Sequence, residues 1–265
     1  KAGVPMSLSL IQKLNEMLLS EQPAYRTQAT QVEKTEKAQR ELLRALINVR
    51  PPRPLSEEFL RMQDALLSAE REARGVVDAM TLPAVPSDAR IVLWQGDITR
   101  LNADAIVNAA NSALLGCFIP CHRCIDNAIH SAAGLQLRAA CEELMKRQGH
   151  PEPTGAAKIT AGYNLPARHV LHTVGPIVHG TLTEEHRQLL ASCYRSCLTL
   201  AAKNGLKSVA FCCISTGEFH FPNDAAAEIA VREVRAFLAE NTSVERVVFN
   251  VFKDDDRCIY ERLLL

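Results

Sequence analysis

The sequence predicts a three-layer α/β/α sandwich that follows an N-terminal helical region. From residue 91 onward, short apolar segments alternate with longer segments of helical periodicity, the pattern of strands covered by helices on both faces. Residues 7–80 instead have helical spacing throughout, with little Gly and few β-branched residues. Apolar residues make up 47% of the 265 residues, so one large domain, or one domain and a smaller one, can be buried.

The N-terminal part divides into two helical stretches. The Pro-rich segment 50–54 separates them, since proline interrupts helices. Ser56 can cap the second stretch, and Glu57 and Glu58 favour its first turn. We expect residues 1–85 to form a helical region and linker that packs on the α/β domain of residues 86–265. The alternative is that this region presents a surface to a partner.

The α/β part contains six expected strands and four expected helices. The strands are 91–95, 105–108, 157–163, 169–174, 209–214 and 244–252. The helices are 125–147, 184–204, 225–240 and 254–265. This order places the loops 97–99, 109–124 and 215–221 along one edge of the sheet, where open α/β sheets bind ligands.

Composition excludes several classes of protein. Lys plus Arg equals Asp plus Glu, 30 of each, which argues against a nucleic-acid-binding surface as the main function. No apolar run reaches the ~20 residues of a membrane span. The nine cysteines are an odd number in a chain of this length, so we expect a reducing cytoplasm rather than a disulfide scaffold. Six of them are expected to be packing residues: Cys141, Cys193, Cys197, Cys212, Cys213 and Cys258.

A metal site is predicted between residues 117 and 124. Cys117, Cys121, His122 and Cys124 lie within eight positions, and thiolates with imidazole suit zinc. Adjacent residues rarely face one ion, so we expect three ligands, Cys117, His122 and Cys124, with an open fourth position. The alternative is a loop with incidental thiols. His130, in the following helix, is expected to pack or to bond the backbone rather than to bind metal.

Six segments, in this order along residues 88–265, resemble the macrodomain family, which binds ADP-ribose. They are QGDIT at 95–99, NAAN at 108–111, IHSAAG at 129–134, HTVGP at 172–176, STG at 215–217 and NVF at 250–252. The resemblance implies a mixed central sheet. The segment GCFIPCHRCIDN at 116–127 is similar to the zinc-dependent branch of that family. That branch implies the ligands Cys117, His122 and Cys124 and leaves the role of Cys121 open.

The resemblance also assigns expected roles around the ligand. Asp97, with Ile98 beside it, would accept from the adenine amino group, unless Asp97 only caps a turn. Phe252 would stack near the adenosine, unless it packs in the core. Asn111 and Asp126 would orient the distal ribose and help to activate water, while Asn127 braces the loop. The loop around the diphosphate and distal ribose would consist of Ser215, Thr216, Gly217, Glu218 and Phe219.

Two functions of different classes follow. The resemblance implies a zinc-dependent hydrolase that removes mono-ADP-ribose from protein side chains, with a lipoyl-carrier protein of the H type and a sirtuin-like transferase as partners. The alternative is a non-catalytic ADP-ribose reader with a structural zinc. Asp126 and an open metal position separate the two, because a reader needs neither. A thiol-based redox sensor, suggested by Cys121 beside the ligands, is a weaker third hypothesis.

Overall fold

The computed structural model describes the backbone of residues 5–265 and the side chains from residue 7 onward. Its centre is a six-stranded sheet of order β2-β8-β7-β4-β6-β5. The strands are β2 Ile91–Gln95, β4 Ala105–Ala109, β5 Ala157–Ala161, β6 His169–Thr173, β7 Ser208–Phe211 and β8 Arg246–Val251. All neighbouring strands pair in parallel except β5, which is antiparallel to β6. The predicted mixed sheet is confirmed.

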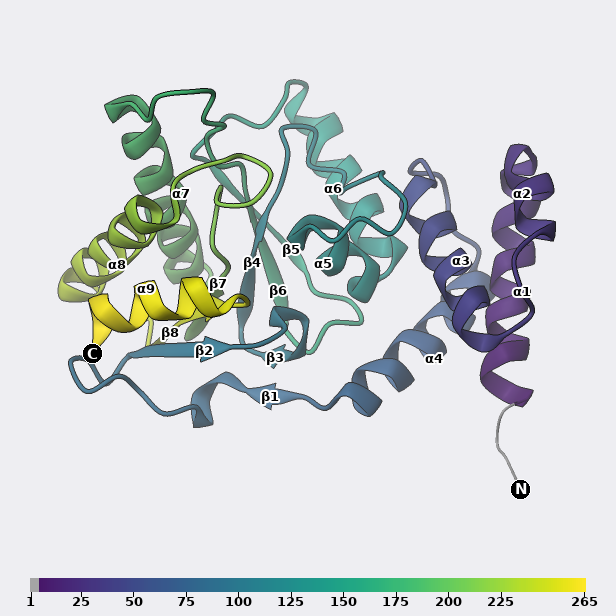
Figure 1. Cartoon of the computed structure of the whole chain (residues 1–265), viewed down its shortest axis with the longest axis horizontal. Coiled ribbons are helices and arrows are strands. Elements are labelled where there is room, and N and C mark those ends of the chain that lie inside the picture. The colour runs from purple at the N-terminus through teal and green to yellow at the C-terminus, as the bar shows by residue number, and fades with distance from the viewer. Residues whose placement is uncertain (1–4) are drawn as a thin grey trace.

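Helices cover both faces of this sheet (Figure 1). On one face lie α5 (Ile125–Ala133) and α6 (Leu135–Gln148), which contact β4 and β5. The other face carries α7 (Glu184–Lys203), α8 (Asn223–Glu240) and α9 (Asp254–Leu264), which pack side by side. The four inner strands β8, β7, β4 and β6 are almost fully buried, whereas the edge strands β2 and β5 are partly exposed. The three-layer α/β/α prediction is therefore confirmed.

The parallel strands end at a common edge of the sheet. Because β2, β8, β7, β4 and β6 run in the same direction, the loops that follow them come together there. This confirms the expected placement of segments 97–99, 109–124 and 215–221, and it adds the ends of β6 and β8.

Three details of the prediction are wrong. The expected helix 125–147 is two helices, because Gly134 adopts φ 100° and ψ 170°, a conformation outside the helix that glycine tolerates. Strand β7 ends at Phe211, so Cys212 and Cys213 follow the strand; Cys212 is buried and Cys213 half-buried. Cys258 is exposed on α9 rather than packed.

The N-terminal region consists of helices. They are α1 (Pro5–Glu21), α2 (Arg26–Thr30), α3 (Glu36–Val49) and α4 (Glu57–Arg74), with a 3-10 turn at Pro23–Tyr25. The Ser56 hydroxyl accepts from the Phe59 amide at 3.1 Å, so the predicted cap of α4 is present. Leu135 of α6 is buried in the small apolar core of these helices. The helical region therefore packs on the α/β domain, as expected.

A short connection leads from these helices to the main sheet. Strand β1 (Val77–Asp78) pairs in parallel with β3 (Leu101–Asn102). The 3-10 turn η2 (Ala79–Thr81) follows, and Ala79 is completely buried in the larger core. A second such turn, η3 (Ile98–Arg100), precedes β3. Within the described residues, no helix has both the length and the apolar character needed to cross a membrane.

Candidate active site

The loop between β4 and α5, residues 110–124 and here called the donor loop, brings together three side chains that could hold a metal ion. The Cys117 sulfur, a ring nitrogen of His122 and the Cys124 sulfur all lie within 4.8 Å of one another. Cys117 Sγ is 3.7 Å from His122 Nδ1. A tetrahedral zinc with bonds of about 2.3 Å to sulfur and about 2.1 Å to nitrogen places those two atoms roughly 3.6 Å apart. The donor set and its spacing fit zinc.

Cys121 is placed differently from these three residues. It has a left-handed backbone, with φ 55°, and it is exposed. Its amide donates to Asn48 Oδ1 at 2.9 Å, and its thiol lies 3.5 Å from the Glu41 carbonyl oxygen of α3. Among the described residues two groups of three donor side chains lie within 4.8 Å of one another, Cys117 with His122 and Cys124, and the buried His130 with Cys141 and His172, and Cys121 belongs to neither. The geometry therefore brings together the three expected ligands without Cys121.

The donor loop leads directly into a helix N-terminus. Cys124 is the N-cap residue of α5, and its sulfur accepts from the Asn127 amide at 3.3 Å. Burial is the main cause that raises the pKa of Cys124 to about 12. The hydrogen bond from the Asn127 amide lowers this pKa, whereas the neighbouring Cys117 raises it. A divalent cation between two thiolates would reverse this effect, because metal binding favours the deprotonated ligands. Asn127 also donates to the Ile119 carbonyl at 3.0 Å, so it braces the loop as expected.

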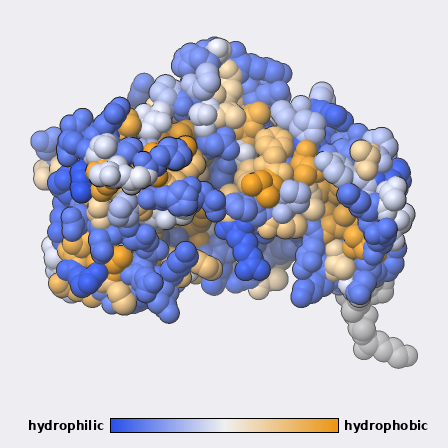
Figure 2. Space-filling view, turned by 45° about the horizontal axis from the view of Figure 1, so that its top comes forward, coloured by the Kyte–Doolittle hydropathy of each residue, from blue (hydrophilic) through white to orange (hydrophobic). Residues whose placement is uncertain are grey.

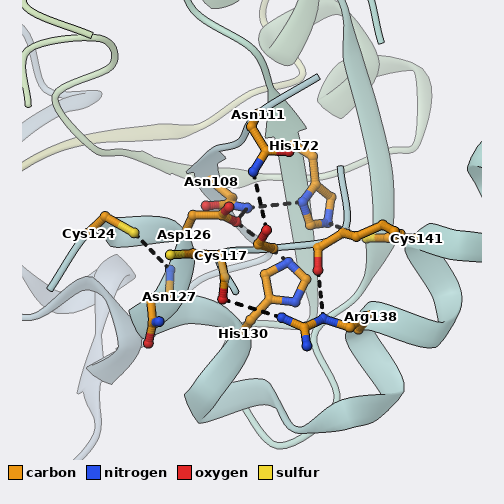
Figure 3. A network of polar contacts seen from close by, with 12 residues as sticks. Asn108, Asn111, Cys117, Cys124, Asp126, Asn127, His130, Arg138, Cys141 and His172 are labelled. Carbon is orange, nitrogen blue, oxygen red and sulfur yellow. Dashed lines mark hydrogen bonds and ion pairs between the residues drawn. The ribbon is translucent and has the colours of Figure 1, made fainter. Parts of the chain in front are cut away.

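Asp126 lies in the first turn of α5, with only 5% of its surface exposed (Figure 3). Asn108 Nδ2 donates to its Oδ1 at 2.8 Å, and His130 Nε2 lies 3.6 Å from the same oxygen. Burial raises the pKa of Asp126 to about 6, while the Asn108 hydrogen bond and the Arg138 charge lower it. A carboxyl group with a pKa near neutrality can hold a water and exchange a proton with it.

Two neutral histidines lie near this carboxylate: His130 beside Asp126 itself, and His172 on the other side of Asn108. His172 Nδ1 is 3.2 Å from Asn108 Nδ2, and its Nε2 is 2.9 Å from Thr160 Oγ1. Burial lowers the pKa of His172 to about 3. Burial, together with His172 and Arg138, also lowers the pKa of His130 well below its usual range. Neither ring nitrogen of His130 has a hydrogen-bond partner among the described residues, so His130 packs and does not bond the backbone.

The loop after β7 forms the other half of the site. Ser215 is buried in a left-handed conformation, with φ 66°. Its Oγ has no hydrogen-bond partner within the part of the chain that the structure describes. Thr216 Oγ1 donates to the Cys213 carbonyl at 3.0 Å, and a Cβ atom added at Gly217 would meet no atom within 4 Å. The turn therefore presents an open backbone and a buried hydroxyl, as a phosphate-binding loop does.

Glu218 and Phe219 connect the two loops. Glu218 Oε1 lies 3.7 Å from His122 Nε2, on the ring side opposite the nitrogen that faces Cys117. Phe219 packs against a small apolar cluster of Ala110, Leu114 and Val174. Both contacts place the loop 215–221 beside the donor loop. Figure 2 shows apolar side chains gathered near the middle of the face that it draws. Phe118 and Ile119 of the donor loop are exposed.

The residues expected at the adenosine lie at the ends of β2 and β8. Asp97 Oδ1 accepts from the Thr99 amide at 2.9 Å and from its hydroxyl at 2.7 Å, so Asp97 does cap η3. Asp97 also lines a cavity of about 90 Å³ with Arg40 and Arg44. Ile98 is buried. Phe252 is 74% exposed, which excludes its alternative role in core packing.

Asn111 is engaged within its own loop. Its Nδ2 donates to the Gly116 carbonyl at 3.2 Å, and its Oδ1 accepts from the Ala113 amide at 3.1 Å (Figure 3). Asn111 and Asp126 therefore lie on either side of the donors, at the start of the loop and in the helix that follows it. The structure brings the predicted site residues to one sheet edge, and their roles toward a ligand stay predictions.

Three residues that support the site were missed from the sequence. Arg138 of α6 and Arg44 and Asn48 of α3 all contact the donor loop. For Arg138 a signal exists: it lies three residues after Leu135 and three before Cys141, both buried, so a cation occupies the apolar face of a helix. No comparable local pattern marks Arg44 or Asn48, whose partners are about eighty residues away.

Comparison with known proteins gives consistent results. The macro domain model matches residues 107–230. A protein-ADP-ribose hydrolase of Treponema medium is 52% identical over 253 residues, covering 95% of this chain and 96% of that protein. A protein-ADP-ribose hydrolase of Staphylococcus aureus (strain MSSA476) is 53% identical over 222 residues, covering 83% of each.

Solved structures similar to this chain are also macrodomains. The Trypanosoma brucei macrodomain in complex with ADP-ribose superposes with a TM-score of 0.66 and 35% identity, covering 83% of this chain and 95% of that one. The Oceanobacillus iheyensis macrodomain with ADP has a TM-score of 0.58 and 41% identity, covering 64% of this chain and 87% of that one. With relatives of this identity along almost its whole length, the chain belongs to the macro domain family.

Proposed function

We propose that this protein is a hydrolase that removes mono-ADP-ribose from modified protein side chains, and that it requires zinc. The observation that carries the proposal is the buried Asp126 carboxylate, two residues after Cys124 in a group of three metal-binding side chains. Relatives that are 52% and 53% identical bear the name protein-ADP-ribose hydrolase. Hydrolysis adds a hydroxyl from water to one fragment and a proton to the other, so the modified side chain is regenerated.

The proposed division of labour follows from the positions of the side chains. Asp126 holds a water or a proton beside the distal ribose, and Asn108 fixes the direction of its carboxylate through the 2.8 Å hydrogen bond. Asn111 contacts the ribose hydroxyls. Zinc held by Cys117, His122 and Cys124 would supply Lewis acidity, polarising an oxygen or lowering the pKa of a water.

The other predicted site residues would hold the diphosphate and the adenosine of ADP-ribose. The backbone of residues 215–219 and the Ser215 hydroxyl would bind the diphosphate, since amides in such turns form anion sites. Asp97 would accept from the adenine amino group, with Ile98 beside it, and the exposed Phe252 ring would stack near the adenosine. In this proposal residues 86–265 are the ADP-ribose-binding, zinc-containing domain, and residues 1–85 are its helical extension and linker.

The protein partners are proposed from the resemblance to the zinc-dependent branch. A lipoyl-carrier protein of the H type would be the modified substrate, and a sirtuin-like transferase would supply the modification. The exposed Phe118 and Ile119 beside the metal donors give a protein substrate an apolar surface to contact.

Incubation with a mono-ADP-ribosylated protein, followed by mass spectrometry of free ADP-ribose, tests the proposal. We expect release of ADP-ribose that stops when a chelator is present and returns when zinc is added back. Release that continues in chelator would contradict the zinc requirement alone. Tight binding of ADP-ribose with no release, in the presence of zinc, would instead support the reader.

A further inference from the structure

The donor loop is attached to the N-terminal helix α3 by two side chains. Arg44 donates through Nε and Nη2 to Asn127 Oδ1, at 3.2 and 2.9 Å, and through Nη2 to the His122 carbonyl at 3.4 Å. One helical turn later, Asn48 Oδ1 accepts from the Cys121 amide at 2.9 Å, and its Nδ2 donates to Ser131 Oγ at 3.1 Å. Both residues of α3 therefore contact the loop within one residue of the expected ligand His122.

Arg138 joins the same two elements from α6. Its Nη1 donates to three carbonyl oxygens at and just after the C-terminus of α3, where a helix leaves carbonyls without a following turn to bond them. Its Nε donates to the Leu115 carbonyl at 2.7 Å and its Nη2 to the Cys117 carbonyl at 3.4 Å, while its guanidinium lies 3.9 Å from the centre of the Phe118 ring. These carbonyls belong to Ile47 at 3.2 Å and Asn48 at 2.9 Å in the last turn of α3, and to the C-cap residue Arg50 at 2.7 Å.

Arg138 is only 3% exposed, so water cannot replace a hydrogen-bond partner that its guanidinium loses. A buried guanidinium is tolerated only when its donors are satisfied, and removing part of its partners leaves an uncompensated charge. The end of α3 and the start of the donor loop therefore stabilise each other through one side chain.

The backbone of the loop also needs this support. Gly116 and Cys121 both have positive φ angles, 88° and 55°. A left-handed conformation is unfavourable for a residue other than glycine, so Cys121 needs a compensating contact. The hydrogen bond from its amide to Asn48 is such a contact, and it holds the residue directly before His122.

We infer that the N-terminal helical region is part of the metal centre, with Arg44, Asn48 and Arg138 as positioning residues that hold the donor loop in its metal-binding shape. The inference rests on the metal site of the proposed function. A loop that is already ordered loses less conformational freedom when it binds a ligand, so it binds more tightly. Removal of these contacts will therefore speed the loss of metal more than it weakens the binding of ADP-ribose.

The test compares Arg44→Ala and Asn48→Ala with Arg40→Ala as a matched control. Arg40 lies one turn before Arg44 on the same helix, but its guanidinium pairs with Glu70 of α4 at 3.0 Å instead of the donor loop. The rate at which zinc passes from the full-length protein to a coloured chelator is measured, together with ADP-ribose affinity by calorimetry. Circular dichroism checks that each variant is folded.

We expect zinc to be lost about 10–100-fold faster from Arg44→Ala and Asn48→Ala, the range seen when residues that orient metal ligands are removed. Arg40→Ala will match the parent in its rate of zinc loss, and ADP-ribose affinity will change little in Asn48→Ala, because Asn48 does not line the cavity beside Asp97. Arg44→Lys keeps one donor for Asn127, so its rate of zinc loss will lie between those of the parent and Arg44→Ala. This variant still tests the inference if Arg44→Ala does not fold.

Folded variants that lose zinc at the parent rate would overturn the inference and leave the proposed function intact. Equal acceleration in Arg40→Ala would also overturn it, because the effect would then come from the helix in general. A parent protein that takes up no zinc would overturn the metal site itself, and the inference with it.

Discussion

Asn108 and Asp126 are joined by a 2.8 Å hydrogen bond from Nδ2 to Oδ1, and both side chains are buried. Asn108 belongs to β4 and Asp126 to the first turn of α5, so the bond connects the strand before the donor loop with the helix after it. Asn108 Nδ2 also lies 3.2 Å from His172 Nδ1. The carboxylate is thus fixed in direction by the framework of the sheet, independently of any ligand.

Asp126→Ala is expected to stop turnover while leaving binding in place. ADP-ribose affinity should stay within about tenfold of the parent, or ~1.4 kcal/mol, and zinc should be retained. Hydrolysis should fall by about 10²–10⁴, as expected for loss of a general acid or base. Elemental analysis, calorimetry and the ADP-ribose release assay measure the three quantities separately.

Asp126→Asn is the matched control, because it keeps an acceptor for Asn108 but removes the acid–base group. It should be as inactive as the alanine variant and closer to the parent in stability, since a buried donor left unsatisfied costs about 1–3 kcal/mol. Hydrolysis at the parent rate by either variant would show that Asp126 is not catalytic.

The purified protein is expected to contain about one zinc per chain, and Cys121→Ser should keep it. The three donors within 4.8 Å of one another do not include Cys121, whereas Cys117→Ser removes one of them and should lose the metal. Elemental analysis of the parent and both variants gives the ratios directly. Loss of zinc from Cys121→Ser would indicate a closed site with four protein ligands and would favour a structural role for the metal.

The layers of the fold could be predicted because each strand and helix has its own periodicity. The failures are positions where tertiary contacts overrode that local signal. The pattern of apolar residues continues through Gly134, so a single helix from 125 to 147 was expected. In the structure the Leu135 amide donates to Gln63 Oε1 of α4 at 2.9 Å, and its side chain enters the N-terminal core. The break at Gly134 permits this contact.

The three metal donors could be predicted because they are close in sequence as well as in space. Arg44 could not, since its contacts with the donor loop span 78 and 83 residues. For the same reason, nothing local indicated that the carbonyls at and just after the end of α3 would be bonded by Arg138, 88 to 91 residues later. Donor identity is a property of a short segment, whereas donor positioning depends on how distant helices pack.

Asp97→Ala should weaken ADP-ribose binding by about 1–3 kcal/mol, the cost of losing a polar partner in a closed site. Because Asp97 also caps η3 through Thr99, a control must separate the two roles. Thr99→Val removes the 2.7 Å hydroxyl contact and keeps the carboxylate, so its affinity should stay near that of the parent. Calorimetry that finds unchanged affinity in Asp97→Ala would exclude Asp97 from the adenine site.

His172 is expected to make the fold sensitive to acid. Burial lowers its pKa in the folded protein to about 3, whereas an unfolded histidine has a pKa of about 6.5. Between these values the unfolded chain binds more protons, so the free energy of unfolding falls as the pH drops below about 6.5 and is unaffected by this group above it. The slope due to His172 approaches roughly 1.4 kcal/mol per pH unit.

His172→Asn keeps a side-chain acceptor near Asn108 but cannot be protonated in this range. Urea unfolding of parent and variant at several pH values from 7.5 to 4.5 gives the slope for each. The variant should be less stable at pH 7.5, because it loses the 2.9 Å contact between His172 Nε2 and Thr160, yet its stability should fall less steeply with acid. Carboxylates, His130 and any bound metal contribute to both proteins, so the difference in slope isolates His172. Parallel curves would mean that His172 is protonated in the folded protein as readily as in the unfolded chain, and that its burial between Asn108 and Thr160 does not hold it neutral.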